Sequence, residues 1–242
     1  MNETLIALPT YNNCGTLADV LDRVQKQGLP ILVVNDGSTD RTADILKGYP
    51  DLHVITHEVN RGKGAALRTA FDWAYAQGYR YVLTIDSDGQ HYPEDIPLFL
   101  QAIEETPDAL LVGSRNIEAE NMPTQNTIAN KTSNFWFTVS TGVHLPDTQT
   151  GYRLYPIRRL RNLRLISGKY EFEMEILVRA IWRDIPVRSI PVRVYYAPGE
   201  ERVSHFRPLR DLLRIVGLNV ALVLIAVFWH HPAKLLKRLQ KK

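Results

Sequence analysis

Two acidic residues one position apart follow an apolar run in the first half of the chain. Asp86 and Asp88 lie in the segment TIDSDGQH, directly after Tyr81 to Leu83. Strand side chains alternate between faces, so acids at this spacing are expected to point the same way and repel each other. A hard cation such as Mg²⁺ or Mn²⁺ would relieve that repulsion, and Gln90 adds a carbonyl oxygen on the same side. The segment predicts a metal site; the alternative is a turn whose acids cap a helix beginning near Pro93.

Three further polar clusters each follow an apolar run: PTYNN at 9–13, NDGSTD at 35–40 and NRGKG at 60–64. The carboxylate of Asp36 could accept N–H groups of a uracil or guanine base, although the residues after it could simply cap the next helix. Lys63, between two glycines at a predicted helix start, suits a phosphate because backbone amides and a cation meet there. The spacing is not that of a P-loop, so a Walker-type ATPase is disfavoured.

The elements that would position these clusters alternate along the chain. Strands are expected at 5–8, 31–34, 53–57 and 81–85, and helices at 16–27, 40–48 and 64–77. This alternation predicts an α/β fold in which helices cover both faces of a mostly parallel sheet. Ligands bind such sheets at the carboxyl ends of the strands, so the four clusters are expected to form one site for a nucleoside diphosphate.

The second half of the chain is less regular. It predicts a strand at 109–113, a loop at 116–130, a helix at 131–141, a turn at 147–153, a helix at 171–182 and a strand at 187–195. The segment from Leu212 to Trp229 is apolar but shorter than the roughly 20 residues that span a bilayer, and basic residues flank both of its ends. We expect a helix that lies in the membrane interface; a packed core helix is the alternative.

Composition limits the class of protein. The 242 residues are 45% hydrophobic and 23% charged, which suits one large domain at 1–205 and a smaller basic and apolar segment at 206–242. The net charge of +3, concentrated near the end of the chain, favours an anionic membrane surface over a nucleic acid. One cysteine and no leader-like start lead us to expect a catalytic domain at the cytoplasmic face of a membrane.

Several enzyme classes lose their main support. The sequence contains no G-x-S-x-G elbow, no H-E-x-x-H and no G-x-G-x-x-G after a strand. Nucleophilic hydrolases, zinc proteases and dinucleotide oxidoreductases are therefore disfavoured.

The order of the motifs resembles that of the family 2 glycosyltransferases with a GT-A (nucleotide-diphospho-sugar transferase) fold, and most closely their polyprenyl-phosphate (dolichol-phosphate) sugar synthase branch. The resemblance covers about residues 4–205. It rests on PTYN at 9–12, VVNDGSTD at 33–40, NRGKGAA at 60–66, DSDGQH at 86–91, GSR at 113–115, DTQTGYR at 147–153 and YEFEME at 170–175.

The resemblance implies an inverting transfer of a sugar from a nucleoside-diphosphate sugar to a lipid-linked acceptor such as a polyprenyl phosphate. By that analogy the base and metal sites are built from motif residues: Pro9, Tyr11 and Asp36 line the base pocket, and Asp86, Asp88 and Gln90 hold Mg²⁺ or Mn²⁺ on the diphosphate. The cation would stabilise the departing nucleoside diphosphate, which gives Asp88 a catalytic role.

The acceptor side has its own candidates. Asp147 lies where related enzymes approach the acceptor, and it would serve as general base for a hydroxyl, whereas an ionised lipid phosphate needs no strong base. The guanidinium fork of arginine suits phosphate oxygens. The candidates for binding an acceptor phosphate are therefore Arg115, Arg153 and Arg207. Surface charge is the alternative for each arginine.

Other functions remain open at this point. The acceptor could be a hydroxyl of a glycan, glycolipid or protein. Paired acids and a basic glycine loop would also suit a sugar-phosphate nucleotidyltransferase, or a nucleotide-sugar-binding membrane protein without catalysis. The apolar segment leaves open whether subunits form a homo-oligomer.

Overall fold

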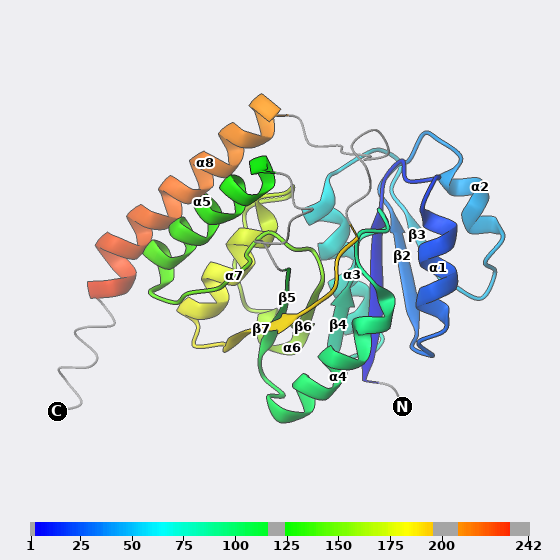
Figure 1. The fold of residues 1–242 in the computed structure, drawn as a ribbon, viewed down its shortest axis with the longest axis horizontal. Helices are drawn as coiled ribbons and strands as arrows, with labels where there is room; N and C mark the ends of the chain where they lie inside the picture. The colour runs from blue at the N-terminus through cyan, green and yellow to red at the C-terminus, as the bar shows by residue number, and fades with distance from the viewer. Residues whose placement is uncertain (1–2, 116–123, 196–207, 233–242) are drawn as a thin grey trace.

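The computed structural model describes residues 3–115, 124–195 and 208–232, and it places a seven-stranded sheet between helical layers (Figure 1). The strand order is β3-β2-β1-β4-β6-β5-β7. The strands are β1 (Thr4–Thr10), β2 (Ile31–Asn35), β3 (His53–Thr56), β4 (Tyr81–Thr84), β5 (Leu110–Ser114), β6 (Arg153–Pro156) and β7 (Val187–Pro191). Only β6, among these strands, runs antiparallel to its neighbours β4 and β5. The expected α/β fold is confirmed, with a sheet that is mixed because of β6.

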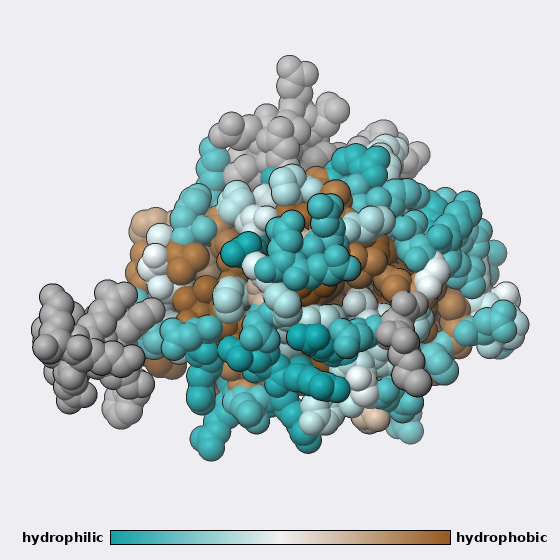
Figure 2. All heavy atoms as spheres, turned by 90° about the horizontal axis from the view of Figure 1, so that it is seen from below, coloured by the Kyte–Doolittle hydropathy of each residue, from teal (hydrophilic) through white to brown (hydrophobic). Residues whose placement is uncertain are grey.

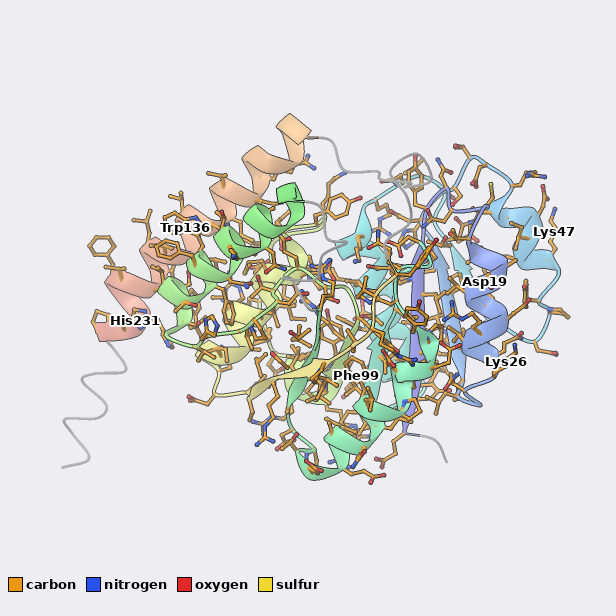
Figure 3. All side chains as sticks on the ribbon, in the orientation of Figure 1. Asp19, Lys26, Lys47, Phe99, Trp136 and His231 are labelled. Atoms are coloured by element: carbon orange, nitrogen blue, oxygen red, sulfur yellow. The ribbon has the colours of Figure 1, made fainter. Side chains whose placement is uncertain are left out.

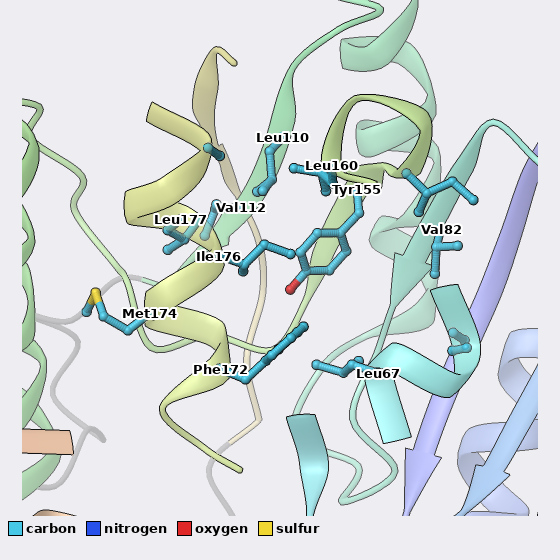
Figure 4. Close-up of a cluster of buried hydrophobic side chains, with 14 of the residues drawn as sticks. Leu67, Val82, Leu110, Val112, Tyr155, Leu160, Phe172, Met174, Ile176 and Leu177 are labelled. Carbon is cyan, nitrogen blue, oxygen red and sulfur yellow. The ribbon is translucent and has the colours of Figure 1, made fainter. Parts of the chain in front are cut away.

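Successive side chains of the strands pack alternately into two hydrophobic cores, one on each face of the sheet. In β1, Leu5 and Ala7 enter one core, whereas Ile6 and Leu8 enter the other. The first core, part of which Figure 4 shows, packs against α3 (Lys63–Ala76), α5 (Thr124–Thr141), α6 (Ile157–Leu160), α7 (Phe172–Trp182) and α8 (Pro208–Ile225). The second core packs against α1 (Leu17–Gln25), α2 (Thr42–Lys47) and α4 (Ile96–Glu105), which follows the short 3₁₀-helix η1 (Pro93–Asp95). Helices therefore cover both faces, as expected.

The segment predicted as an apolar C-terminal helix forms α8 and the π-helical turn η3 (Ala226–His230) that continues it. α8 lies beside α5 in Figure 1 and also contacts α7. Leu218 and Leu222 of α8 are buried in the same core as α7, so one face of the helix is a core face. None of the helices in the described part of the chain combines the length and apolarity needed to cross a bilayer. The predicted boundary at residue 205 lies outside the described residues.

Three local predictions were wrong. The helix expected from residue 131 begins at Thr124, within the expected loop, so a composition rich in Thr and Asn did not exclude a helix there. β6 was not expected, since its four residues RLYP begin with a charge and end in proline, yet all four are buried. β7 ends at Pro191, four residues early, because Pro191 lies opposite Ser114, the last residue of its partner strand β5.

The sheet brings the polar clusters to one edge. β1 pairs in parallel with β2 and β4, so the three strands end at the same side of the sheet. Thr10 lies opposite Asn35, and Thr84 lies opposite Ala7. Asp86 and Asp88, however, follow the end of β4, so a turn rather than strand alternation sets their orientation.

We predict that two glycine-to-alanine changes in helices have opposite effects on stability. A Cβ on Gly64 of α3 would lie 2.6 Å from Phe172 Cβ and 2.7 Å from the Gly168 carbonyl carbon, so Gly64→Ala should destabilise by about 1–3 kcal/mol. A Cβ on Gly217 of α8 meets nothing within 4 Å, so Gly217→Ala should stabilise by about 0.5–1 kcal/mol. Urea denaturation measures both; equal effects of the two changes would contradict the close packing of α3 on the 168–172 segment.

Candidate functional site

A mostly buried lysine joins two acids at the carboxyl edge of the sheet. Lys63, the first residue of α3, places Nζ 2.8 Å from Asp86 Oδ1 and 3.0 Å from Asp86 Oδ2. The same Nζ lies 3.0 Å from Glu173 Oε2 near the start of α7. One ammonium is therefore shared by two carboxylates that come from opposite halves of the chain.

Close packing leaves room for this ion pair only because residue 151 is a glycine. A Cβ on Gly151 would clash with the Asp86 carboxylate and would lie 2.5 Å from Lys63 Nζ. Thr84 Oγ1 donates to the Gly151 carbonyl oxygen at 2.7 Å, which fixes this loop to the end of β4. The loop therefore forms a tight wall against the Lys63–Asp86 pair.

The charges of the group stabilise one another. Burial would lower the pKa of Lys63, but the negative charges of Asp86 and Glu173 raise it, so the amine stays protonated. Burial would raise the pKa of Asp86, but the ammonium of Lys63 lowers it. Burial and then the negative charge of Asp86 raise the pKa of Asp88 to about 6. Asp88 thus carries the unbalanced charge of the group.

Asp88 and Gln90 leave acceptor atoms for a cation. Asp88 Oδ1 accepts a hydrogen bond from the Gln90 backbone N–H at 2.9 Å, and Asp88 forms no ion pair with any described residue. Among the described residues no three His, Cys, Asp or Glu side chains converge as a metal site. Mg²⁺ typically uses one or two protein carboxylates and completes its shell with water and substrate phosphates. The raised pKa of Asp88 fits a divalent cation bound in that way.

Asp36 supports the loop before α3. Its Oδ1 accepts hydrogen bonds from the Arg61 backbone N–H at 2.9 Å and from His57 Nδ1 at 2.7 Å, and its Oδ2 accepts one from the Gly62 backbone N–H at 2.7 Å. His57 Nε2 in turn lies 2.9 Å from Thr69 Oγ1. Contact between Asp36 and a nucleotide base stays a prediction, since these three donors occupy most of the carboxylate's acceptor capacity.

The loops after β1 and β2 are joined by an asparagine. Asn12 Oδ1 accepts a hydrogen bond from the Thr39 backbone N–H at 2.8 Å, and the Asn12 backbone N–H donates to Ser38 Oγ at 3.0 Å. Pro9 and Tyr11 flank this contact and are half-buried. The residues predicted to bind a base therefore come together at the ends of β1 and β2, and their role remains a prediction.

Asp147 belongs to a second group beside the first. Its Oδ2 accepts a hydrogen bond from Arg115 Nε at 2.6 Å, and its Oδ1 accepts one from Arg115 Nη2 at 3.1 Å. Asn130 Nδ2 and the Gln149 backbone N–H also donate to Oδ1, at 2.6 and 3.0 Å. Burial would raise the pKa of Asp147, but Arg115 lowers it. A buried carboxylate with donors on both oxygens is a poor general base, and its contacts hold Arg115 in place; a catalytic role for Asp147 stays a prediction.

The candidate arginines have different environments. Arg153 is completely buried and donates to the carbonyl oxygens of Thr150, Glu173 and Thr148 at 2.7, 2.6 and 2.9 Å. The prediction that Arg153 binds an acceptor phosphate was therefore wrong: a guanidinium held by three backbone carbonyls braces the loop internally. Arg207 lies outside the described residues, and Arg115 stays a candidate.

His91 lies between the two groups. It is buried, and its pKa falls to about 4 because of burial, while the charges of Asp86, Arg115, Lys63 and Asp147 all act on it. Its Nε2 lies 3.4 Å from Thr150 Oγ1, and its ring packs against Tyr152. A largely neutral imidazole therefore lies close enough to feel the charges of the acid-rich group and of the Asp147–Arg115 pair.

Glu173 is the residue of the site that the sequence did not reveal, because we expected the acids at the start of α7 to be solvated helix-start charges. Every residue from Phe172 to Val178 is buried. Three acids within an otherwise apolar helix start were the available signal, since buried acids require cationic partners. Glu175, the neighbouring buried acid, accepts hydrogen bonds from Ser167 and Arg179.

Comparisons with known proteins place the chain in a family. The sequence model "Glycosyl transferase family 2" matches residues 5–161. The chain is 33% identical to a polyprenol monophosphomannose synthase of Mycolicibacterium smegmatis over 202 residues, covering 78% of this chain and 76% of that one. It is 30% identical to an undecaprenyl-phosphate mannosyltransferase of Micrococcus luteus, covering 83% of this chain and 87% of that one.

Two solved structures share the fold of this chain. Mannosyl-3-phosphoglycerate synthase of Rubrobacter xylanophilus superposes with a TM-score of 0.66 at 20% identity, covering 90% of this chain and 72% of that one. S. aureus TarS in complex with UDP-GlcNAc gives a TM-score of 0.63 at 19% identity, covering 94% and 68%. At these identities the likeness shows the GT-A-like fold alone. Taken with the matched sequence model and the identity to the mycobacterial synthase, the chain belongs to glycosyl transferase family 2.

Proposed function

We propose that this glycosyltransferase moves a sugar from a nucleoside diphosphate to a polyprenyl phosphate, with inversion at the anomeric carbon and with the help of Mg²⁺ or Mn²⁺. The observation that carries the choice of acceptor is the state of Asp147. A buried carboxylate with a lowered pKa and donors on both oxygens suits an acceptor that needs no deprotonation. Relatives named for polyprenol, undecaprenyl-phosphate and dolichyl-phosphate acceptors support the same choice.

The proposed reaction is a single displacement. An ionised oxygen of the acceptor phosphate forms a bond to the anomeric carbon while the bond from that carbon to the diphosphate oxygen breaks. Inversion follows because the attacking oxygen approaches opposite the leaving group. Arg115, held by Asp147, would orient the acceptor phosphate through its guanidinium fork. No proton has to leave the acceptor, so none of the described side chains needs to act as a strong base.

The donor side would be assembled by the loops at the carboxyl edge of the sheet. Asp88 and Gln90, with Asp86, are the residues that would hold a divalent cation on the diphosphate. The bound cation would neutralise charge that develops on the leaving nucleoside diphosphate. Pro9, Tyr11 and Asp36 stand at the neighbouring strand ends, where the nucleoside would lie.

We also propose that the exposed side of α8 docks on the cytoplasmic face of an anionic membrane. Val220, Leu224 and Phe228 are 53%, 52% and 75% exposed, at four-residue spacing on the face opposite the core. Phe135 and Trp136 of α5 are exposed as well, and Figure 3 shows Trp136 beside α8. Figure 2 shows hydrophobic atoms gathered on the side of the molecule where α5 and α8 lie. The sequence continues with five basic residues: Lys234, Lys237, Arg238, Lys241 and Lys242.

Asp88→Ala should reduce release of nucleoside diphosphate by about a hundredfold or more, because the cation would lose its unpaired carboxylate. The assay supplies a uridine or guanosine diphosphate sugar, Mn²⁺ and a polyprenyl phosphate in vesicles. Asp44→Ala is the matched control, since Asp44 is paired only with exposed Lys47 on the surface of α2. Unchanged turnover in the Asp88 variant would contradict the proposal that Asp88 holds a divalent cation on the donor diphosphate.

Changes at the acceptor pair should separate a phosphate acceptor from a hydroxyl acceptor. Arg115→Met should raise KM for the polyprenyl phosphate by about tenfold or more and leave donor KM unchanged, because a charge-assisted hydrogen bond is lost. Asp147→Asn should raise the same KM, because Arg115 loses its carboxylate partner. Steady-state kinetics at matched thermal stability measures both. A fall in kcat without a change in acceptor KM for Asp147→Asn would instead identify a general base and a hydroxyl acceptor.

Removing the apolar surface of α8 should release the protein from membranes. The double variant Val220→Glu/Leu224→Glu should lower cosedimentation with vesicles that contain phosphatidylglycerol by about tenfold or more, since each buried aliphatic side chain contributes about 1.5–3 kcal/mol. Leu98→Glu on α4 is the control, because Leu98 is also exposed but belongs to another helix. Full vesicle binding by the double variant, together with a halved particle mass in solution, would show that this surface joins two copies instead.

A further inference from the structure

The shared lysine of the candidate site has more acceptors than it uses. Lys63 Nζ contacts both oxygens of Asp86 but only Oε2 of Glu173. Glu173 is 7% exposed, and its Oε1 is buried without a hydrogen-bond partner among the described residues. An unpaired buried carboxylate oxygen is costly unless a donor reaches it in another state of the site. Glu173 Oε1 is therefore an acceptor, on a carboxylate that Lys63 already contacts, to which no described donor is bonded.

The backbone around Lys63 is fixed, so its side chain is the part that can move. Asp36 accepts hydrogen bonds from the backbone N–H groups of Arg61 and Gly62, the two residues before Lys63. A Cβ on Gly62 would lie 2.8 Å from Lys169 Cγ, which shows how closely this turn packs. Lysine has a long flexible stem, so rotation about its side-chain bonds can move Nζ while Cα stays in place.

Asp86 has to lose contacts before it can bind a metal. Both of its oxygens face the Lys63 ammonium, at 2.8 and 3.0 Å. A carboxylate oxygen that coordinates a divalent cation cannot keep an ammonium at the same position, because the two cations repel each other. The ion pair lies directly against residue 151, where a Cβ would meet Asp86 and Lys63. At least one Asp86 oxygen must therefore give up its contact with the ammonium, and Glu173 Oε2, 3.0 Å from Lys63 Nζ, is the second acid within reach.

We propose that Glu173 is a positioning residue that retains Lys63 while Asp86 exchanges the ammonium for the divalent cation. This inference rests on the proposed function, because it concerns the metal of the same donor site. In the loaded site Lys63 donates to Glu173 and to an oxygen of the donor diphosphate, whereas Asp86 binds the cation. Glu173 thereby keeps a buried ammonium paired during the exchange and lowers the free-energy cost of loading the metal.

The test measures Mn²⁺ binding in the absence of acceptor, so that no turnover occurs. Electron paramagnetic resonance titrations with UDP and with GDP give the dissociation constant of Mn²⁺. Glu173→Gln should weaken Mn²⁺ binding by about tenfold, since Lys63 is then held by Asp86 alone. Glu171→Gln removes the same charge from the residue before α7, and Glu171 forms no described contact with Lys63; it should change the constant by less than about twofold.

A double-mutant cycle separates retention of Lys63 from a simple loss of negative charge. In a Lys63→Met background, Glu173→Gln should change Mn²⁺ binding by less than about twofold, because no ammonium remains to be retained. An equal loss in both backgrounds would overturn the inference. Because Lys63→Met leaves two buried acids unpaired and could impair folding, a crystal of the unaltered protein with Mn²⁺ and UDP or GDP provides a second test.

In that crystal, Lys63 Nζ should contact Glu173 and a phosphate oxygen, with Asp86 on the metal. A Lys63 that still contacts both Asp86 oxygens would overturn the inference and leave the proposed function intact. Absence of Mn²⁺ binding by the unaltered protein with both nucleotides would overturn the metal in the proposed function and the inference together. Mn²⁺ binding that Glu173→Gln does not alter would overturn only the inference.

Discussion

The candidate site depends on one mostly buried ammonium that balances two carboxylates, of which Glu173 is buried and Asp86 is partly exposed. Without Lys63, Asp86 and Glu173 would face each other in a weakly solvated region with no counter-charge, which is among the costliest arrangements in a protein interior. The requirement accounts for the surrounding sequence. Gly151 must lack a side chain to leave room for the pair, and Asp36 must hold the backbone before α3 so that Lys63 starts from a fixed position. The N-terminal and C-terminal halves of the domain are thereby joined at the place where ligand is expected.

Much of the fold follows from local sequence. Apolar runs, helical periodicity and polar clusters at strand ends predict the sheet and its functional edge, because each feature is decided within about ten residues. What sequence reasoning missed depends on long-range packing. β6 is only four residues long and is held by pairing with β4 on one side and β5 on the other, and α5, which begins in an Asn- and Thr-rich stretch, packs against α7 and α8. The fold class was predictable, whereas these boundaries were not.

The functional residues divide in the same way. The spacing of Asp86 and Asp88 predicted that they lie close together. It did not predict that Lys63, 23 positions before Asp86, pairs with Asp86, or that Glu173 of α7 also pairs with Lys63. Arginines illustrate the limit most clearly. Arg115 and Arg153 look equivalent in sequence, yet one is held by a carboxylate in the candidate site and the other by three backbone carbonyls inside the protein. The direction in which a long side chain points is decided by the available partners, which sequence alone does not identify.

The net charges of the two groups of the site, the one around Lys63 and the Asp147–Arg115 pair, differ. This difference is the reason for proposing a divalent cation at the donor diphosphate and none at the acceptor phosphate. When ionised, Asp86, Asp88 and Glu173 oppose a single ammonium, so the first group carries excess negative charge and would repel a diphosphate. A divalent cation reverses that sign locally. In the second group, the charges of Asp147 and Arg115 cancel. Two hydrogen bonds from the guanidinium to the carboxylate hold Arg115 in one orientation, and the pair carries no excess negative charge. In the proposed reaction, the phosphate of the lipid acceptor would therefore approach Arg115 directly, whereas the donor diphosphate would approach Asp88 with a divalent cation between them.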